Sequence, residues 1–352
     1  MSHNEEYISE FLTTQKKIEA LALRDMDFGN ATVNEQFIND INFPLKKLAL
    51  NMQTNFLGSD QNTLNFLIKF ANTLEELELG SIFPASVYEM IFRRFKKLKV
   101  LDVSLTHAPN EDNFYINLQP NASVEKLIIR GLKTKNEKKL QGFMGNLPNV
   151  ESLVLIDLPL SKEMILFMSN NLQKLEEINM ETLEVSSFKE VVLPNIKSLR
   201  IKSLKTINND DWHAICLSLP NIQKFSVKNV FDMSSLSDLM FPIFTEGWKS
   251  LTHIDLGTGF KPSECIFTVL LRNSKNLKTV SIPARQRLTD LIHQLFEEAQ
   301  GPRLFFKSLK QQQQGHHVGL WENEDFYDEI DDELDDEVND GTDESDDEID
   351  DS

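Results

Sequence analysis

The most regular feature of this sequence is an apolar triplet that returns at nearly constant spacing along the chain. Each triplet follows the pattern LxxLxL, in which Ile, Val, Phe or Met can replace Leu. The first triplet begins at Ile18 and the eleventh at Leu277, so one triplet occurs about every 26 residues. The eleven triplets are Ile18-Leu21-Leu23, Leu45-Leu48-Leu50, Leu74-Leu77-Leu79, Leu98-Leu101-Val103, Val124-Leu127-Ile129, Val150-Leu153-Leu155, Leu175-Ile178-Met180, Ile196-Leu199-Ile201, Ile222-Phe225-Val227, Leu251-Ile254-Leu256 and Leu277-Val280-Ile282.

The second half of each triplet predicts a short strand. Successive side chains of a strand point to opposite faces, so in the sixth repeat Leu153 and Leu155 are expected to point into the core. Ser152, Val154 and Ile156 are then expected to point away from it. With one strand in each repeat, stacking the repeats gives a parallel sheet.

The segments between triplets predict helices. Apolar residues recur there at steps of three and four in SVYEMIFRRF, EMILFMSNNL, WHAICLSL, ECIFTVLLRN and LTDLIHQLFEEA. Several segments open with a residue suited to cap a helix, namely Ser161, Asp211 and Ser263. Turns at LPN or KN precede the next strand.

A repeat of one strand and one helix predicts an α/β leucine-rich-repeat solenoid, with a curved parallel sheet on the concave side and helices on the convex side. About 11 such repeats are expected, because one unit cannot bury both its faces. The expected organisation is an N-terminal helix or cap at 1–17, the solenoid at 18–300, a degenerate closing strand at 301–310, a linker at 311–321 and an acidic tail at 322–352.

The turns that lead into the strands carry a resemblance to a known family. NLPNVESLVL, SLPNIQKFSV and LPNIKSLRI resemble the cysteine-containing repeats of F-box/LRR proteins. The position three residues after each triplet has no Asn in any repeat, which favours this class over the asparagine-ladder class, although the cysteine of the class is also absent there. The resemblance covers about residues 5 to 307.

The resemblance implies a non-enzymatic module for protein binding, related to the substrate-recognition part of F-box/LRR ubiquitin-ligase receptors. An F-box is not expected, since only 17 residues precede Ile18. We therefore expect that the chain does not itself join a cullin ligase.

The outward-facing strand residues predict two candidate binding groups on the concave face. The apolar group is Val100, Ile128, Val154 and Ile156, which can either contact a partner or pack against one another across the sheet. The basic group is Arg200, Lys202, Lys224 and Lys228, which can hold an acidic partner peptide, a phosphorylated degron or the chain's own tail, or can be an ordinary solvated face. Acidic residues of opposite sign lie at Glu76, Glu78, Glu177 and Glu181.

The net charge of −19 is confined to one end of the chain. Residues Glu322 to Ser352 contain 19 Asp and Glu and no Lys or Arg, which leaves 36 acidic and 36 basic residues upstream. This composition predicts a disordered tail. Phe326 or Tyr327, Ile330 and Leu334 are spaced as anchors on one helix face.

The acidic tail supports an alternative function. Acidic segments with aromatic anchors resemble those of histone chaperones, so a second hypothesis is a leucine-rich-repeat chaperone for histones or other basic proteins. The alternative for the tail itself is a solubilising segment. Nucleic acid is not an expected partner, because the chain is acidic and has no long basic stripe.

The sequence contains no pattern that indicates catalysis, a cofactor or a metal. The two cysteines, Cys216 and Cys265, lie in apolar segments and indicate a reducing compartment. No apolar run reaches the roughly 18 to 20 residues that cross a bilayer, and the N-terminus is unlike a signal peptide. We therefore expect no membrane partner and a cytoplasmic or nuclear location.

Overall fold

The computed structural model describes most of the residues that carry the repeat pattern. The described ranges are 10–24, 35–51, 60–80, 83–104, 118–131, 137–158, 160–183, 185–204, 209–230, 246–258, 276–283 and 303–307. By its contacts the chain divides into two compact units, Met1–Lys307 and Ser308–Ser352. Every described residue belongs to the first unit, so the linker and the acidic tail lie outside the described residues.

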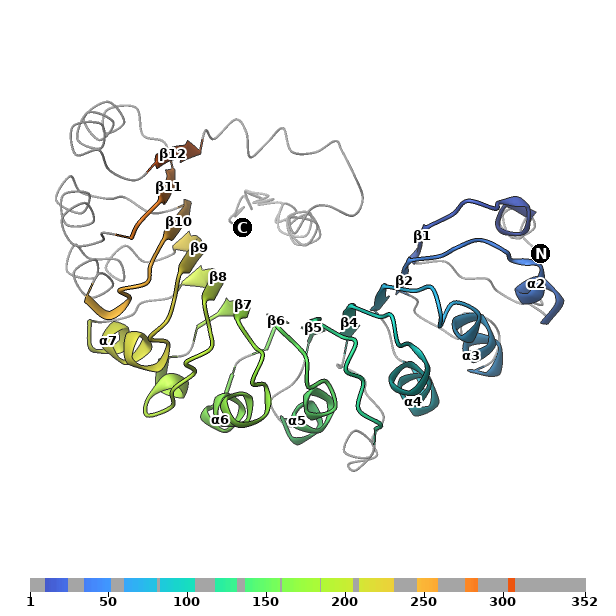
Figure 1. The fold of residues 1–352 in the computed structure, drawn as a ribbon, viewed down its shortest axis with the longest axis horizontal. Coiled ribbons are helices and arrows are strands. Elements are labelled where there is room, and N and C mark those ends of the chain that lie inside the picture. The colour runs from blue at the N-terminus through green and yellow to red at the C-terminus, as the bar shows by residue number, and fades with distance from the viewer. Residues whose placement is uncertain are drawn as a thin grey trace, which may run out of the picture. The chain divides into compact units, whose positions relative to one another are not determined.

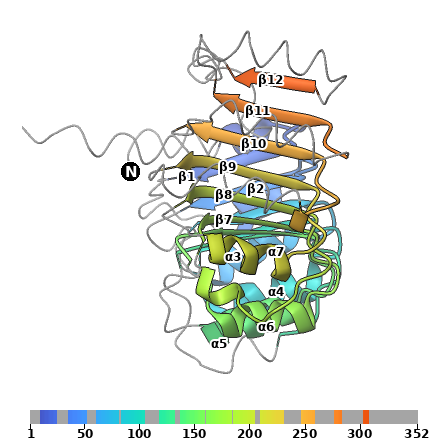
Figure 2. The same ribbon diagram turned by 90° about the vertical axis from the view of Figure 1, so that its left-hand side faces the viewer.

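The first unit is built on one parallel sheet, which confirms the α/β leucine-rich-repeat solenoid predicted from the triplets. The strands lie in the sheet in the order of the chain, from β1 to β12, and each one pairs in parallel with the next. Figure 2 shows β7 to β12 stacked with their arrows pointing the same way. The strands are β1 (Ala20–Arg24), β2 (Lys47–Asn51), β3 (Glu76–Leu79), β4 (Val100–Ser104), β5 (Lys126–Arg130), β6 (Ser152–Ile156), β7 (Glu177–Thr182), β8 (Ser198–Leu204), β9 (Lys224–Val230), β10 (His253–Thr258), β11 (Thr279–Pro283) and β12 (Arg303–Lys307).

Helices cover one face of this sheet. Within the described part of the first unit, the strands line the inner side of an arc and the helices lie on its outer side (Figure 1). We call the helix-free face of the sheet the inner face. The helical elements are α2 (Glu35–Asp40), α3 (Asp60–Lys69), α4 (Ala85–Arg94), α5 (Glu137–Gly145), α6 (Lys162–Asn171), the 3-10 helix η3 (Val185–Phe188) and α7 (Asn209–Ser218).

The core lies between the sheet and the helices, and strand alternation fills it as predicted. Leu153 and Leu155 are 0% and 1% exposed, whereas Ser152 and Ile156 at the ends of β6 are half-buried. Aromatic side chains also fill the core toward the C-terminal repeats. There the ring centroids of Phe225 and Trp212 lie 5.9 Å apart. One elongated core therefore runs through successive repeats, as expected of units that cannot fold alone.

Three of the predicted helices lie where the apolar spacing placed them, at α4, α6 and α7. The predicted cap at Ser161 is confirmed, because its side-chain oxygen accepts the backbone N–H of Met164. The predicted cap at Asp211 is wrong. Helix α7 begins two residues earlier, at Asn209, and Asp211 lies in its first turn, where Lys189 pairs with it at 3.4 Å. The cap predicted at Ser263, with the last two predicted helices, lies outside the described residues.

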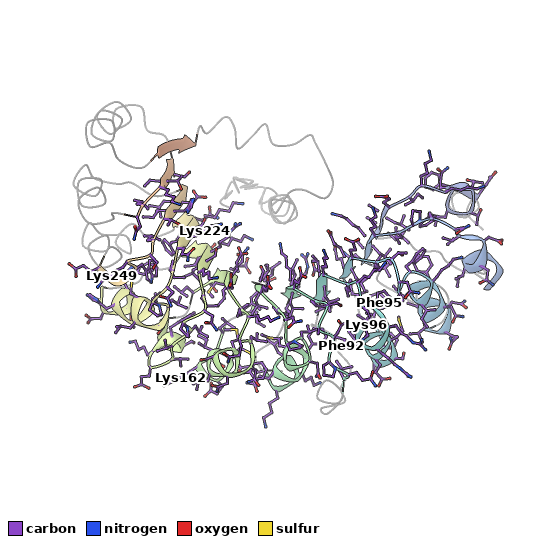
Figure 3. The ribbon with its side chains drawn as sticks, in the orientation of Figure 1. Phe92, Phe95, Lys96, Lys162, Lys224 and Lys249 are labelled. Atoms are coloured by element: carbon purple, nitrogen blue, oxygen red, sulfur yellow. The ribbon has the colours of Figure 1, made fainter. Side chains whose placement is uncertain are left out.

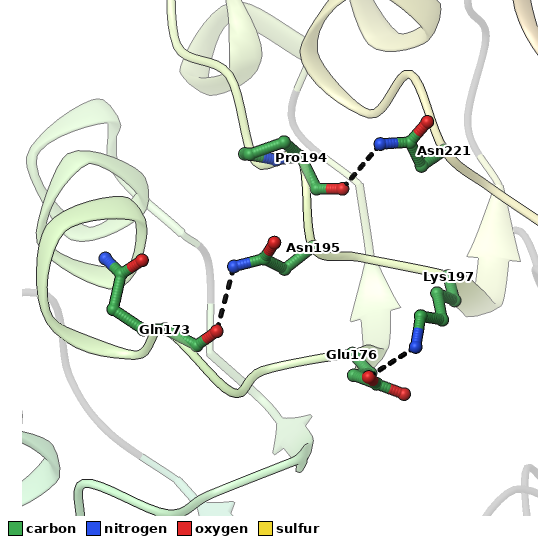
Figure 4. Close-up of polar contacts among 6 residues, drawn as sticks. All are labelled: Gln173, Glu176, Pro194, Asn195, Lys197 and Asn221. Atoms are coloured by element: carbon green, nitrogen blue, oxygen red, sulfur yellow. Dashed lines mark hydrogen bonds and ion pairs between the residues drawn. The ribbon is translucent and has the colours of Figure 1, made fainter.

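Asparagine side chains join the turns of successive repeats. Asn195 donates its Nδ2–H to the carbonyl of Gln173 at 2.8 Å, and Asn221 donates to the carbonyl of Pro194 at the same distance (Figure 4). Two further bonds of this kind lead from Asn149 to Ala122 and from Asn276 to Lys249. These asparagines belong to the LPN and KN turns, so residues that indicate a turn in the sequence also tie each turn to the preceding repeat.

One glycine sets how closely two strands approach. A Cβ atom on Gly257 of β10 would lie 1.8 Å from the carbonyl oxygen of Lys228 in β9. That separation is far below any permitted contact, so β9 and β10 can take this spacing only because residue 257 has no side chain.

Candidate functional site

The strand register arranges the side chains of the inner face in rows that run across the strands. From β2 to β11, the residue that opens each strand pairs with the residue that opens the next, and the third residues do the same. The first row runs through Lys47, Glu76, Val100, Lys126, Ser152, Glu177, Ser198, Lys224, His253 and Thr279. The second row runs through Ala49, Glu78, Asp102, Ile128, Val154, Asn179, Arg200, Ser226, Asp255 and Ser281.

The apolar group predicted for this face is brought together by the register. Ile128 and Val154 are direct neighbours in the second row, and each is almost covered, at 6% and 9% exposed. Val100 and Ile156 stay half-buried at the ends of their strands. The group therefore offers a partner its two outer members, while its centre is already packed within this chain.

An ion pair lies beside this apolar centre. Asp102 follows Val100 in β4 and is 4% exposed, although it points to the inner face. Arg130 of β5 binds both of its oxygens, Nε to Oδ1 at 3.0 Å and a terminal nitrogen to Oδ2 at 2.7 Å. The two parallel hydrogen bonds compensate the buried carboxylate and fix its orientation.

Two members of the predicted basic group are paired with acidic residues of the preceding strand. Arg200 Nε lies 3.3 Å from Glu177 Oε1, and Lys202 Nζ lies 3.1 Å from Glu181 Oε1. Lys224 and Lys228, the other two members, are exposed on β9. Acidic residues that interrupt the basic group in the sequence thus pair with Arg200 and Lys202 in the fold.

The carboxylate of Glu181 is held in its charged form. Its Oε2 accepts the backbone N–H of Asp157 at 2.8 Å, and Asp157 adopts a left-handed backbone with φ of 55°. Burial acts to raise the pKa of Glu181, but hydrogen bonds from Asp157 and Lys202 outweigh it, so the pKa lies below its ordinary value.

His253 is a residue of the inner face that the sequence patterns did not single out. It opens β10, with Lys224 of β9 and Thr279 of β11 beside it in the first row. Partial burial lowers its pKa, and the charges of Lys224 and Lys278 lower it further. The sequence did contain a signal for this placement. His253 directly precedes Ile254 in the tenth triplet, and a residue at that point of a strand must face away from the core.

The outer side also presents apolar side chains. Leu217 on α7 is 75% exposed, Val192 after η3 is 51% exposed and Leu166 on α6 is 42% exposed. Ser169 of α6 donates its hydroxyl to the carbonyl of Val192, so the α6 and η3 segments lie against each other there. We refer to these three exposed residues as the outer apolar group; Leu166 and Leu217 lie on helices, which cover the face of the sheet opposite the inner face.

Two comparisons with known proteins found no match, one with family models and one with curated proteins. Among solved structures, the chain is similar to one in the crystal structure of the Rad7 and Elc1 complex in yeast. The TM-score is 0.47 and the sequence identity is 15%, over 86% of this chain and 78% of that one. The assignment of the solenoid accordingly rests on the strand order and the triplet register.

The described part of the chain holds no cluster of three or more His, Cys, Asp or Glu side chains that could hold a metal ion. Burial raises the pKa of the Cys216 thiol to about 12, which keeps it in the unreactive protonated form near neutral pH. No helix among these residues is long and apolar enough to cross a membrane.

The predicted tail anchors Phe326, Tyr327, Ile330 and Leu334 lie outside the described residues, as does Cys265. Binding by the tail therefore stays a prediction.

Proposed function

We propose that this chain is a non-enzymatic protein-binding module that holds a partner on the inner face of its sheet. The observation that carries the proposal is the inner face itself. It is a continuous parallel sheet that the described helices leave uncovered, and its rows combine charged side chains with the half-buried Val100 and Ile156. Concave sheets of this kind present a wide surface on rigid elements, which suits recognition of a folded or extended protein.

We further propose that the partner is selected for ubiquitination. The support is the resemblance of the NLPNVESLVL and SLPNIQKFSV segments to the repeats of F-box/LRR receptors. In that role the chain would supply recognition, and a separate component would supply ligase activity.

A site-specific cross-linking experiment tests the binding face. A photoreactive phenylalanine analogue is placed at Asn179 or Ser226 on the inner face, and at Leu217 on the outer side. The same partner is expected from both inner positions, and Leu217 is expected to give little of it. A partner recovered from Leu217 alone would assign binding to the outer apolar group and end the proposal.

The ubiquitin role has its own test. Depleting the chain in cells is expected to lengthen the half-life of the cross-linked partner, because a recognition subunit limits the turnover of what it selects. An unchanged half-life would remove this role and leave binding on the inner face in place.

The tail supports a second candidate, a chaperone for basic proteins. Nineteen acidic residues between Glu322 and Ser352, with no Lys or Arg among them, complement a strongly basic partner. Deleting residues 322 to 352 is expected to weaken binding of a core histone by more than about tenfold at low salt if this candidate is correct. Unchanged histone binding would reject it.

A further inference from the structure

The ion pairing of the inner face changes between its N-terminal and C-terminal strands. From β2 to β8, four of the described ion pairs join a cation of one strand to a carboxylate of an adjacent strand. These pairs are Lys47–Glu76, Arg130–Asp102, Arg200–Glu177 and Lys202–Glu181. Each of these cations is therefore at least partly neutralised within the chain.

At β9 to β11, two lysines depart from this pattern. Lys224 opens β9, and Lys278 directly precedes β11; both are exposed, and neither has an ion-pair or hydrogen-bond partner among the described residues. Figure 3 shows Lys224 on the inner side of the arc, whereas Lys249 lies on the outer side. The two lysines flank the strand that His253 opens, so two cations and an imidazole occupy neighbouring positions at one end of three strands.

Among the described residues, His253 makes a hydrogen bond through one ring nitrogen and leaves the other for a ligand. Its Nδ1 lies 2.6 Å from the hydroxyl oxygen of Thr252, and that hydroxyl donates its proton to the carbonyl of Gln223 at 2.9 Å. In the protonated ring both nitrogens carry an N–H, so Nδ1 then donates to the Thr252 hydroxyl and the Nε2 N–H can donate to an acidic ligand.

We propose that Lys224, His253 and Lys278 form a binding site for an acidic, extended segment of a partner protein. The proposal rests on the proposed function and names the chemistry of the partner for one part of the inner face. Lys224 and Lys278 have no ion-pair partner among the described residues, whereas Lys47, Arg130, Arg200 and Lys202 are paired, so the two lysines leave positive charge that an acidic segment can neutralise.

The spacing of the strands fits an extended peptide that crosses them. Neighbouring strands lie about 4.8 Å apart, so the backbones that carry Lys224 and Lys278 are separated by about 10 Å. Alternate side chains of an extended peptide lie about 7 Å apart on one face, and the lysine side chains are long and flexible enough to take up the difference. Two acidic side chains of the peptide can therefore meet the two lysines, with His253 between them.

Binding at this site is coupled to proton uptake by His253. In the free protein burial and the charges of Lys224 and Lys278 lower the pKa of the ring below its ordinary value, which favours the neutral form. The groups near it are Lys224 from β9, Thr279 from β11 and Lys278, which directly precedes β11, and Asp255 lies two residues further along its own strand. An acidic ligand offsets the two lysine charges and accepts a hydrogen bond from protonated Nε2. Affinity therefore increases as the pH falls through the pKa of the ring.

Fluorescence anisotropy on the full chain tests the site, with a labelled peptide rich in Asp and Glu as the probe. Lys224→Glu and Lys278→Glu are each expected to lower the affinity at least about tenfold at low salt, because a cation is replaced by a like charge of the ligand. Lys249→Glu changes the net charge equally on the outer side and is expected to stay within about twofold, since its charge is distant and screened. Equal losses for Lys224→Glu and Lys249→Glu would overturn the proposal, as would absence of peptide binding.

The probe is acidic and not phosphorylated, so its own charge is constant between pH 7.5 and pH 5.5. Over this range the wild-type affinity is expected to increase, and the affinity of His253→Gln is expected to stay constant. Nuclear magnetic resonance of the histidine ring protons gives a second measurement, in which the peptide must raise the pKa of His253. A single-stranded oligonucleotide that binds as tightly as the peptide would show attraction of any anion and would also overturn the proposal.

Circular dichroism of each variant shows whether it is folded, and the cross-linking experiment separates this proposal from the proposed function. If Asn179 and Ser226 cross-link a partner but Lys224→Glu behaves like Lys249→Glu, the inner face binds proteins without this acidic site.

Discussion

Asn221 donates its side-chain amide to the carbonyl of Pro194, 27 residues earlier in the chain and one repeat away in the fold. The bond ties the turn before β9 to the turn before β8 (Figure 4). The same bond recurs where Asn195 meets the carbonyl of Gln173. These turns enter the strands that carry Lys202 and Lys224, so the asparagines position part of the inner face.

Asn221→Ala is expected to lower the free energy of unfolding by about 0.5 to 1.5 kcal/mol, the net value of one hydrogen bond. Urea denaturation followed by circular dichroism measures the change. Asn42→Ala is the matched control, because Asn42 is exposed and its side chain makes no hydrogen bond within the described residues. Equal midpoints for the two variants would show that the bond between turns contributes nothing.

The pair Arg130–Asp102 is expected to respond unequally to loss of its two members. The Asp102 side chain is 5% exposed and that of Arg130 is 23% exposed. Arg130→Ala leaves a buried carboxylate without its guanidinium, whereas Asp102→Ala leaves an arginine that can turn toward water. Arg130→Ala should therefore lower the free energy of unfolding more than Asp102→Ala does, by about 1 kcal/mol or more. Urea denaturation measures both changes.

Lys47→Ala is the control for this prediction. Its partner is Glu76 at 2.9 Å, and both side chains are about a third exposed, so the loss is expected to stay below about 1 kcal/mol. If Asp102→Ala destabilises the protein as much as Arg130→Ala, burial of the carboxylate does not determine the stability that is lost when the pair is broken.

Glu181 is expected to make stability depend on pH. A carboxyl group whose pKa is lower in the folded state stabilises it above the unfolded pKa of about 4.3. That contribution is lost as the pH falls through the folded pKa. Glu181→Gln should therefore lower the urea midpoint at pH 7, and the difference from wild type should shrink as the pH is lowered below 4.

Glu163→Gln is the control for the pH experiment, because Glu163 is exposed on α6 and has no ion-pair partner among the described residues. It should change the midpoint little at either pH. A Glu181→Gln deficit of the same size at pH 7 and pH 3.5 would show that the charge of Glu181 is not responsible.

Cys216 is expected to resist modification in the folded protein. The side chain is 5% exposed and its pKa is raised to about 12 by burial, so little thiolate is present at pH 8. In a Cys265→Ser variant, which leaves Cys216 as the one thiol, labelling by a disulfide reagent should require unfolding by urea. Rapid labelling without urea would contradict the packing around α7.

The repeat, the strands and the direction of the core residues could be predicted from the sequence, because they follow from spacing alone. Leu153 and Leu155 are buried because alternate residues of a strand face the helices. The same reason applies to the corresponding residues of the other repeats. The cap of α7 was predicted at Asp211, which instead lies in the first turn of the helix, since Asn209 and Asp210 also suit the first turn and spacing alone does not choose among them.

The ion pairs could not be predicted from the rows of the inner face. Arg200 lies directly opposite Asn179 in the register, and it reaches Glu177 diagonally, two residues earlier in β7. Whether a long side chain reaches straight across or diagonally depends on its rotamer and on the room beside it. The sequence predicted a basic group and an acidic group as separate features, and the fold joins them into pairs.

The close approach of β9 and β10 at Gly257 has a consequence for how this surface could diversify. Lys228, whose carbonyl oxygen excludes a side chain at position 257, is in the same strand as Lys224, and Gly257 is in the same strand as His253. Replacing the glycine with any larger residue would force these two strands apart and alter the separation of Lys224 from His253. A substitution at position 257 could thus change the ligand preference of the proposed site, although residue 257 itself has no side chain that would contact a ligand.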